Sequence, residues 1–255
     1  MSKMQLKADL SGKRALVTGA SSEGFGAHFA RVLAANGAEV IVVARRRAPL
    51  ESLVAEIRQS GGVALAVTAD VSDQASVEAA ISDAGPLDIV VNNAGVERSG
   101  SVLGLSEADY DYVMDINLKG VWLVATVAAR QMRDRGQGGS IINIASITGH
   151  RGMKGAAPYS VSKAGVLHMT RQLAQELARY GIRVNSISPG YFATDLNREF
   201  LASEAGETMR KRIAMRRFGD FPDLDGALLL LASDASGFMT GSDIVVDGGH
   251  LLYSL

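Results

Sequence analysis

The chain has 255 residues, 47% of them hydrophobic, and its formal net charge at pH 7 is -1. A near-neutral charge gives no electrostatic reason to expect nucleic acid or an anionic membrane as a partner. The sequence contains no cysteine, which excludes disulfides, thiolate catalysis and cysteine-ligated metal. We therefore expect one globular domain, residues 1–255, of the size usual for a large α/β fold.

We expect neither a signal peptide nor a membrane-spanning segment. The first ten residues are polar and lack the apolar run of a signal peptide. The longest apolar stretch, residues 227–232, is far too short to span a bilayer. We expect a cytoplasmic protein without a membrane partner.

Short runs rich in valine and isoleucine alternate with longer segments of helical pattern. The runs are apolar on both faces, which is typical of buried parallel strands. This alternation predicts an α/β fold: a doubly wound, Rossmann-type, mostly parallel sheet with helices on both faces. The predicted strands are residues 15–17, 39–44, 64–68, 89–91, 140–145, 183–188 and 243–246.

Three of the predicted helices carry end signals. The helix over residues 27–36 is closed by Gly37, and the helix over residues 159–180 is closed by Gly181. Ser106 precedes Asp109 by three residues, an approximate capping box that begins a long helix through Asn117 and Trp122.

A glycine-rich turn follows the first predicted strand. The turn reads Thr18-Gly19-Ala20-Ser21-Ser22-Glu23-Gly24-Phe25-Gly26 and leads into a helix. Glycines let main-chain N–H groups approach a pyrophosphate, and the helix N-terminus adds a partial positive charge. The alternative is an ordinary glycine-rich turn, but its place between a strand and a helix favours a cofactor phosphate site.

The end of the second predicted strand indicates whether a dinucleotide site here would prefer NAD or NADP. A site that prefers NAD usually has an acid there, but no acid lies between Glu39 and Glu51. Arg45, with Arg46, could instead neutralise a 2′-phosphate. This favours NADP(H), with NAD(H) possible; the alternative is that these arginines are a solvated helix start.

Tyr159 and Lys163 are four residues apart and share one face of a predicted helix. An ordinary tyrosine has a pKa of about 10, too high for efficient proton exchange at neutral pH. An ammonium ~4 Å away, at an effective dielectric of ~20, contributes ~4 kcal/mol, or about three pKa units. The pair is therefore expected to bring the phenol near pH 7, although such pairs also occur on ordinary helix surfaces.

Together, these motifs identify a resemblance that covers nearly the whole chain. The sequence resembles the short-chain dehydrogenase/reductase family, whose members are NAD(P)-dependent oxidoreductases. The matching residues, in order, are Thr18, Gly19, Gly24, Phe25, Gly26, Asp70, Val71, Asn92, Asn93, Ala94, Gly95, Asn117, Ser146, Tyr159, Lys163, Pro189, Gly190, Thr194, Asp247, Gly248 and Gly249.

The resemblance implies the catalytic roles. Tyr159 would exchange a proton with the carbonyl or alcohol oxygen, and Ser146 would hydrogen-bond that oxygen. Lys163 would bind the nicotinamide ribose and lower the pKa of Tyr159. Asn117 would hold a water linked to Lys163.

The resemblance also implies the cofactor contacts. Asp70 and Val71 would contact the adenine, residues 92–95 the ribose, and Pro189, Gly190 and Thr194 the nicotinamide. The full predicted set is Gly19, Ser21, Ser22, Gly24, Phe25, Gly26, Arg45, Asp70, Val71, Asn92, Asn93, Ala94, Gly95, Tyr159, Lys163, Pro189, Gly190 and Thr194.

The glycine loop departs from the family pattern. Four residues, rather than the usual three, separate Gly19 from Gly24. This leaves open which loop residue touches a 2′-phosphate and how strongly NADP is preferred. A carboxylate beside that phosphate would be repulsive, so we expect Glu23 to point outward to solvent.

The substrate side is less defined by the sequence. Residues 191–217 have the position and helical, charged character of the family's substrate lid. This region contains a basic cluster, which could attract an acidic carrier or form a solvated helix face: Arg210, Lys211, Arg212, Arg216 and Arg217. No metal is expected, because the four histidines lack paired ligand spacing. The expected pocket residues are Ser146, Tyr159, Glu97, His150, Met153 and Tyr191.

We expect an NADP(H)-dependent enzyme that interconverts a ketone and a secondary alcohol. The alternative is a reductase of 3-oxoacyl thioesters, carried on an acyl carrier protein or CoA; a remote one is a non-catalytic cofactor-binding regulator. The expected partner is a small carbonyl or alcohol substrate. The resemblance further implies a homo-oligomer, a tetramer, with interfaces near Trp122, Leu173 and Val246.

Overall fold

The computed structural model describes residues 8–193 and 198–252. All seven strands pair in parallel, in the order β3-β2-β1-β4-β5-β6-β7. This confirms the doubly wound sheet. The strands are β1 (Arg14–Thr18), β2 (Glu39–Ala44), β3 (Val63–Thr68), β4 (Ile89–Asn92), β5 (Gly139–Ile144), β6 (Ile182–Pro189) and β7 (Asp243–Val246).

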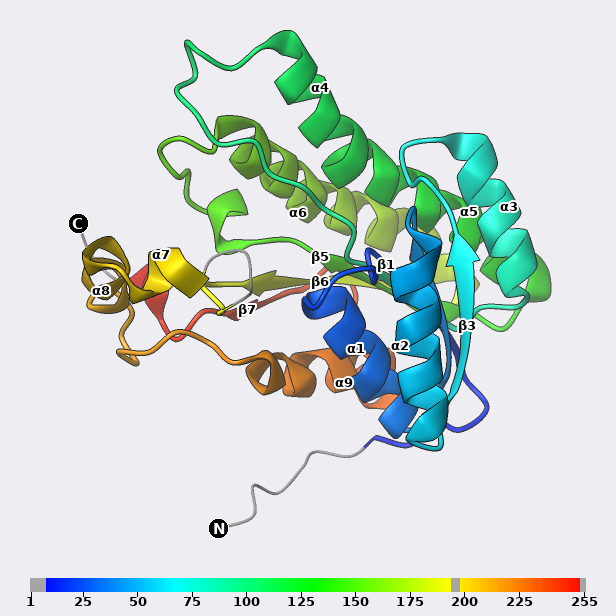
Figure 1. The fold of residues 1–255 in the computed structure, drawn as a ribbon. Helices are drawn as coiled ribbons and strands as arrows, with labels where there is room; N and C mark the ends of the chain where they lie inside the picture. The colour runs from blue at the N-terminus through cyan, green and yellow to red at the C-terminus, as the bar shows by residue number, and fades with distance from the viewer. Residues whose placement is uncertain (1–7, 194–197, 253–255) are drawn as a thin grey trace.

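Helices cover both faces of the sheet, as Figure 1 shows. One face packs against α1 (Phe25–Ala35), α2 (Arg47–Gln59) and α9 (Asp225–Ala232). The other packs against α3 (Gln74–Ala84), α5 (Gly120–Arg135) and α6 (Ala157–Leu177). The remaining helices are α4 (Glu107–Met114), α7 (Arg198–Ala202) and α8 (Glu204–Arg210).

The edge strands differ from the prediction of runs buried on both faces. Val63 and Leu65 of β3 are 58% and 38% exposed, and Val245 of β7 is 40% exposed. The five inner strands are buried over nearly all their length. The cause is position: an edge strand has a neighbour on one side only, so the helices cover it incompletely.

The predicted helix ends are confirmed. Ser106 and Asp109 form a reciprocal capping box at the start of α4. Gly37 and Gly181 have φ of 98° and 71°, the left-handed region in which glycine is favoured. The helix from α4 to α5 is continuous, but it contains a π-helical turn, Asp115–Lys119, that the sequence pattern does not reveal.

The continuous helix Glu107–Arg135 is long and apolar enough to cross a membrane by length and composition alone. In this fold 56% of its most apolar window is buried inside the protein. It supplies residues such as Leu123 and Met132 to the core against the sheet. Its apolar character is therefore explained by packing.

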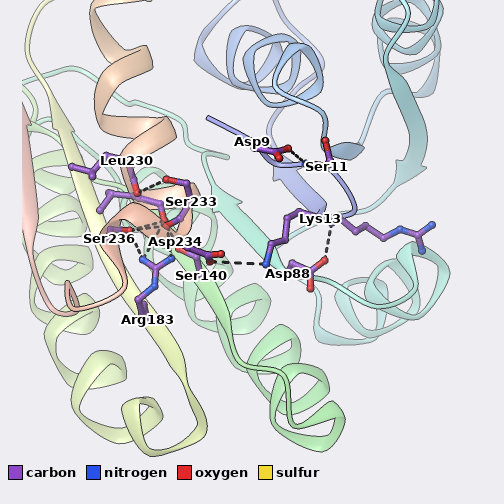
Figure 2. Close-up of polar contacts among 12 residues, drawn as sticks. Asp9, Ser11, Lys13, Asp88, Ser140, Arg183, Leu230, Ser233, Asp234 and Ser236 are labelled. Atoms are coloured by element: carbon purple, nitrogen blue, oxygen red, sulfur yellow. Dashed lines mark hydrogen bonds and ion pairs between the residues drawn. The ribbon is translucent and has the colours of Figure 1, made fainter. Parts of the chain in front are cut away.

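The amino ends of the strands carry structural polar contacts (Figure 2). Arg183, at the start of β6, donates to the Ser236 hydroxyl at 2.6 Å and to the carbonyls of Leu231 and Ser233. These bonds satisfy carbonyl groups at the end of α9. Lys13 and Asp234 form an ion pair at 4.0 Å beside them. This edge holds α9 in place, and the candidate site lies at the opposite edge.

Candidate active site

A cavity of about 750 Å³ opens at the carboxyl ends of the strands, where the strand order reverses between β1 and β4. Ligands of doubly wound sheets bind at this position. Most of the predicted cofactor residues line the cavity together with Ser146 and Glu97. The predicted residues in its lining are Gly19, Ser21, Ser22, Phe25, Gly26, Arg45, Asp70, Val71, Asn93, Ala94, Gly95, Glu97, Ser146, Tyr159, Lys163, Pro189 and Gly190.

The glycine loop packs too closely for side chains at two positions. A Cβ at Gly19 would lie 2.7 Å from the Ala94 Cα, and one at Gly26 would lie 2.5 Å from the Gly19 carbonyl oxygen. Gly24 begins α1 with no side-chain cap, and the first turn of α1 has no acidic residue. The N–H groups of this turn therefore remain suited to an anion such as a pyrophosphate.

Glu23 points away from the cavity, as predicted. Its carboxylate pairs with Arg31 at 3.1 Å, and its side chain is 68% exposed. Arg31 also binds Glu56, at 2.8 Å. The extra loop residue therefore places its charge on an exposed ion-pair cluster outside the phosphate site.

Two arginines stand at the end of β2 on the cavity wall. Arg46 donates to the main-chain carbonyl of Ser21 at 2.8 Å and approaches the Ser21 hydroxyl at 3.4 Å. Arg45 contributes to lowering the pKa of Asp70, although a hydrogen bond from the Ser72 side chain is the larger cause. Arg47 pairs with Glu51 at 2.7 Å and is not part of the lining. Two cations thus face the adenosine end of the cavity.

Asn92, the last residue of β4, and Asn93, the next residue, point in different directions. Asn93 donates from its side chain to the Thr18 carbonyl at 2.9 Å, and its main-chain N–H donates to the Thr18 hydroxyl at 3.0 Å. Asn92 is buried and donates to the Asn143 side chain at 2.9 Å, away from the cavity lining. The Asn92 side chain is thus turned toward the neighbouring strand β5, and its contact with the cofactor stays a prediction.

Lys163 lies behind Tyr159 on α6. Its ammonium donates to the Ile144 carbonyl at 2.8 Å and lies 5.6 Å from the centroid of the Tyr159 ring. A Cβ at Gly95 would come within 3.5 Å of the Asn117 side-chain oxygen and 3.6 Å of the Lys163 ammonium. The missing side chain of Gly95 therefore keeps open the space shared by Asn117 and Lys163.

Asn117 occupies the π-helical turn and is fully buried. Its side-chain oxygen accepts from the Val96 N–H at 2.8 Å. Its amide donates to the Val96 carbonyl at 2.8 Å and to the Ser162 hydroxyl at 3.2 Å. Asn117 therefore lies behind the cavity wall and fixes the segment that follows β4.

The pKa values of the tyrosine–lysine pair differ from expectation. Burial raises the pKa of Tyr159 to about 12, the nearby Glu97 and Tyr191 add to the rise, and the Ser146 hydroxyl opposes it. Burial lowers the pKa of Lys163 to about 8. The expected phenol pKa near 7 is wrong for the protein alone, because it neglected the cost of burying a charge.

Ser146 follows β5 and begins a short 3-10 turn, Ile147–Gly149. Its hydroxyl oxygen accepts from the Thr148 N–H at 3.2 Å and from the Thr148 hydroxyl at 3.0 Å. Its hydroxyl also hydrogen-bonds to the Tyr159 phenol, which opposes the rise in the pKa of Tyr159 and places the two hydroxyl groups side by side in the cavity.

Three of the expected pocket residues lie outside the cavity lining. Tyr191 donates to the Met153 sulfur at 3.0 Å, and Tyr191 lines a second cavity, of about 230 Å³. His150 binds Asp243 at 2.8 Å and Ser188 at 3.2 Å. These partners at the β6–β7 edge engage its Nε2 atom, and a role of His150 in the substrate pocket stays a prediction.

The lid region carries α7 and α8, while Thr194 lies outside the described residues. Arg210 forms two hydrogen bonds to Glu207, at 2.6 and 2.7 Å, and Arg217 pairs with Asp223. These pairs support the interpretation of the basic residues as a solvated surface, although only Arg210 lies on a helix, at the end of α8. Within residues 8–193 and 198–252, no group of three or more acidic or histidine side chains could hold a metal.

Sequence reasoning missed several lining residues. Arg98 lies 4.5 Å above the centroid of the Tyr112 ring, and both line the cavity with Ile116. Tyr112 and Ile116 come from α4 and the π-helical turn. No local pattern reveals that the end of α4 and the π-helical turn line the cavity.

Comparisons with known proteins agree with this geometry. Residues 19–250 match the family described as Enoyl-(Acyl carrier protein) reductase. The chain is 39% identical to gluconate 5-dehydrogenase of Gluconobacter oxydans (strain 621H), covering 94% of this chain and 95% of that protein. It is also 39% identical to 3-oxoacyl-[acyl-carrier-protein] reductase of Staphylococcus aureus (strain Mu50 / ATCC 700699), covering 93% and 97%.

A solved structure has the same fold. The crystal structure of a gluconate 5-dehydrogenase from Burkholderia cenocepacia J2315, in complex with NADP and tartrate, superposes with a TM-score of 0.92 at 37% identity. The match covers 96% of this chain and 98% of that one. The similarity therefore extends over the sheet, the cavity and the lid region.

Proposed function

This chain belongs to the short-chain dehydrogenase/reductase family of oxidoreductases, and on that premise we propose that it interconverts a ketone and a secondary alcohol with NADP(H). One observation carries the proposal: Tyr159, Lys163 and Ser146 line the same cavity as the glycine loop and Arg45. The test is oxidation of NADPH and NADH in parallel against ketones, with Tyr159→Phe as control.

The residues present fit a dinucleotide with a 2′-phosphate. The uncapped start of α1 and the close-packed Gly19 and Gly26 suit a pyrophosphate, while Arg45 and Arg46 supply positive charge for the 2′-phosphate. Asp70 and Val71 would border the adenine. Thr194 stays a proposed contact of the nicotinamide end. When bound, the cofactor supplies or accepts the hydride.

Tyr159 is proposed as the acid–base group. With its pKa raised to about 12, the phenol is neutral at neutral pH and can donate its proton to the carbonyl oxygen. Ser146 donates a hydrogen bond to the same oxygen and holds it beside the phenol. For alcohol oxidation, the Lys163 ammonium stabilises the phenolate that accepts the proton.

Lys163 and Asn117 are proposed to resupply the proton. Burial lowers the pKa of Lys163 to about 8, close enough to neutral pH for proton exchange. Asn117 and Lys163 flank the same space beside Gly95, which fits a bridging water. From this position on α6, Lys163 could also bind the nicotinamide ribose, which is the role that the family resemblance implies.

A 3-oxoacyl thioester reductase is the second candidate. It is favoured by the 39% identity to the Staphylococcus aureus enzyme of that name. Turnover of free ketones without turnover of thioesters would separate the two. A non-catalytic regulator is disfavoured, because Asn117, Ser146, Tyr159 and Lys163 are all retained.

We further propose a cytoplasmic homotetramer. Trp122 on α5 and Val161 on α6 are 48% and 53% exposed, and Val245 presents an apolar side chain on β7. Leu173 is itself buried in the core, so the α6 contribution would come from exposed neighbours such as Val161. Sedimentation as a monomer at micromolar concentration would contradict the tetramer.

A further inference from the structure

Glu97 brings a negative charge to the reaction end of the cavity. It lines the cavity with Ser146 and Tyr159, two residues after the Gly95 that borders Lys163. Its charge reaches both phenols, Tyr159 and Tyr191. The other acid in the lining is Asp70, at the adenosine end, where Ser72 donates two hydrogen bonds to it.

The Glu97 carboxylate has no cation beside it among residues 8–193 and 198–252. Its hydrogen bond is with a neutral group, the Ser99 hydroxyl, at 2.8 Å. The adjacent Arg98 is directed elsewhere: it pairs with Asp109 at 3.6 Å and stacks over the Tyr112 ring at 4.5 Å. An ionised carboxylate only accepts hydrogen bonds, so Glu97 has acceptor positions left for a ligand.

Glu97 is exposed to solvent on the cavity wall, so a ligand that fills the cavity displaces part of its water. A carboxylate that loses water must receive hydrogen bonds from the ligand, or binding is weakened. A hydroxyl or ammonium group of the ligand, beside its reacting carbon, would donate a hydrogen bond to the Glu97 carboxylate. An alkyl chain at that place could not donate one, and a carboxylate would be repelled.

Resting on the proposed function, we propose that Glu97 is the specificity-determining residue of this site and selects substrates with a hydrogen-bond donor on the carbon next to the reacting carbon. Vicinal diols and amino alcohols, with the matching ketones, are the classes with this chemistry. A simple alcohol, which carries only alkyl groups next to its reacting carbon, is a poorer substrate.

The test compares matched alcohols with NADP⁺ as oxidant: butane-2,3-diol, 3-aminobutan-2-ol, butan-2-ol and 2-hydroxybutanoate. For wild type we expect kcat/KM for the diol and the amino alcohol to exceed that for butan-2-ol by about tenfold or more. Glu97→Leu should remove both preferences. Glu97→Gln, which keeps an acceptor oxygen but no charge, should lose the preference for the amine and retain part of that for the diol.

Glu107→Gln is the matched control, since it removes one carboxylate from the exposed first turn of α4, outside the cavity lining. This variant should leave the kcat/KM ratios between the four alcohols unchanged. A second readout is the pH profile of oxidation: loss of the Glu97 charge lowers the pKa of Tyr159, so the rising limb should move to lower pH in Glu97→Gln.

The outcomes are distinguishable from failure of the proposed function. If the ratio of kcat/KM for the diol to that for butan-2-ol is equal in wild type and in a folded Glu97→Leu variant, the role of Glu97 is overturned. The proposed oxidoreductase function would still stand. No turnover of any alcohol or ketone by wild type, with NADPH bound, would instead overturn the proposed function. A thermal unfolding curve for each variant verifies that it is folded.

Discussion

The ammonium of Lys163 lies 5.6 Å from the centroid of the Tyr159 ring and donates to the Ile144 carbonyl at the end of β5. Lys163 is buried and Tyr159 is half-buried at the cavity wall, and the loss of water opposes the charged form of each. The protein alone therefore holds a neutral tyrosine beside an easily deprotonated lysine.

Lys163 makes the stability of the protein depend on pH. Its pKa is about 8 in the folded state and about 10.5 when unfolded, so the unfolded state binds more protons between these values. Stability should rise with pH in this window, by about 2 kcal/mol from pH 7.5 to 9.5 from this group. Urea unfolding of wild type and Lys163→Met at both pH values measures this change in the free energy of unfolding. An equal change with pH in the two proteins would contradict the lowered pKa of Lys163.

The arginines after β2 should set cofactor preference. We expect Arg45→Ala with Arg46→Ala to weaken NADPH binding by about tenfold to a hundredfold, with little change for NADH, because a charge-assisted contact to the 2′-phosphate is lost. Fluorescence titration with both cofactors measures this. Arg47→Ala is the control, since Arg47 pairs with Glu51 outside the cavity lining.

Two glycines of the same loop should respond differently to alanine. Gly26→Ala places a Cβ 2.5 Å from the Gly19 carbonyl and should cost about 1–3 kcal/mol of stability and weaken cofactor binding. Gly24→Ala meets only the Ser22 hydroxyl, at 3.7 Å, and should be tolerated in the fold. Thermal unfolding compares them, and equal losses would argue against the close packing of the loop.

His150 should act in stability rather than in substrate binding. His150→Ala removes a partner of Asp243, which still accepts from Ser186 and Ser188. We expect a loss of about 1 kcal/mol and an unchanged KM. A tenfold rise in KM at unchanged stability would return His150 to the substrate pocket.

The sequence predicts the sheet, the strand ends and most of the cavity lining. These depend on local patterns: apolar runs, the glycine loop and the four-residue spacing of Tyr159 and Lys163. The direction of the Tyr159 pKa was missed because burial is set by the whole fold. The side-chain partners of Asn92 and His150 also depend on the whole fold: Asn92 bonds to Asn143 of the next strand, and His150 bonds to Asp243, which is 93 positions away in sequence.

The central claim is tested most directly by transfer of the cofactor hydride to a ketone. Wild type and Tyr159→Phe would be given deuterium-labelled NADPH with a panel of aryl ketones, aliphatic ketones and 3-oxoacyl thioesters, and NADH in parallel. We expect deuterium in a secondary alcohol product with NADPH, and a loss of about a hundredfold or more in kcat for the variant that still binds cofactor. Equal turnover by Tyr159→Phe, or turnover with NADH alone, would contradict the account.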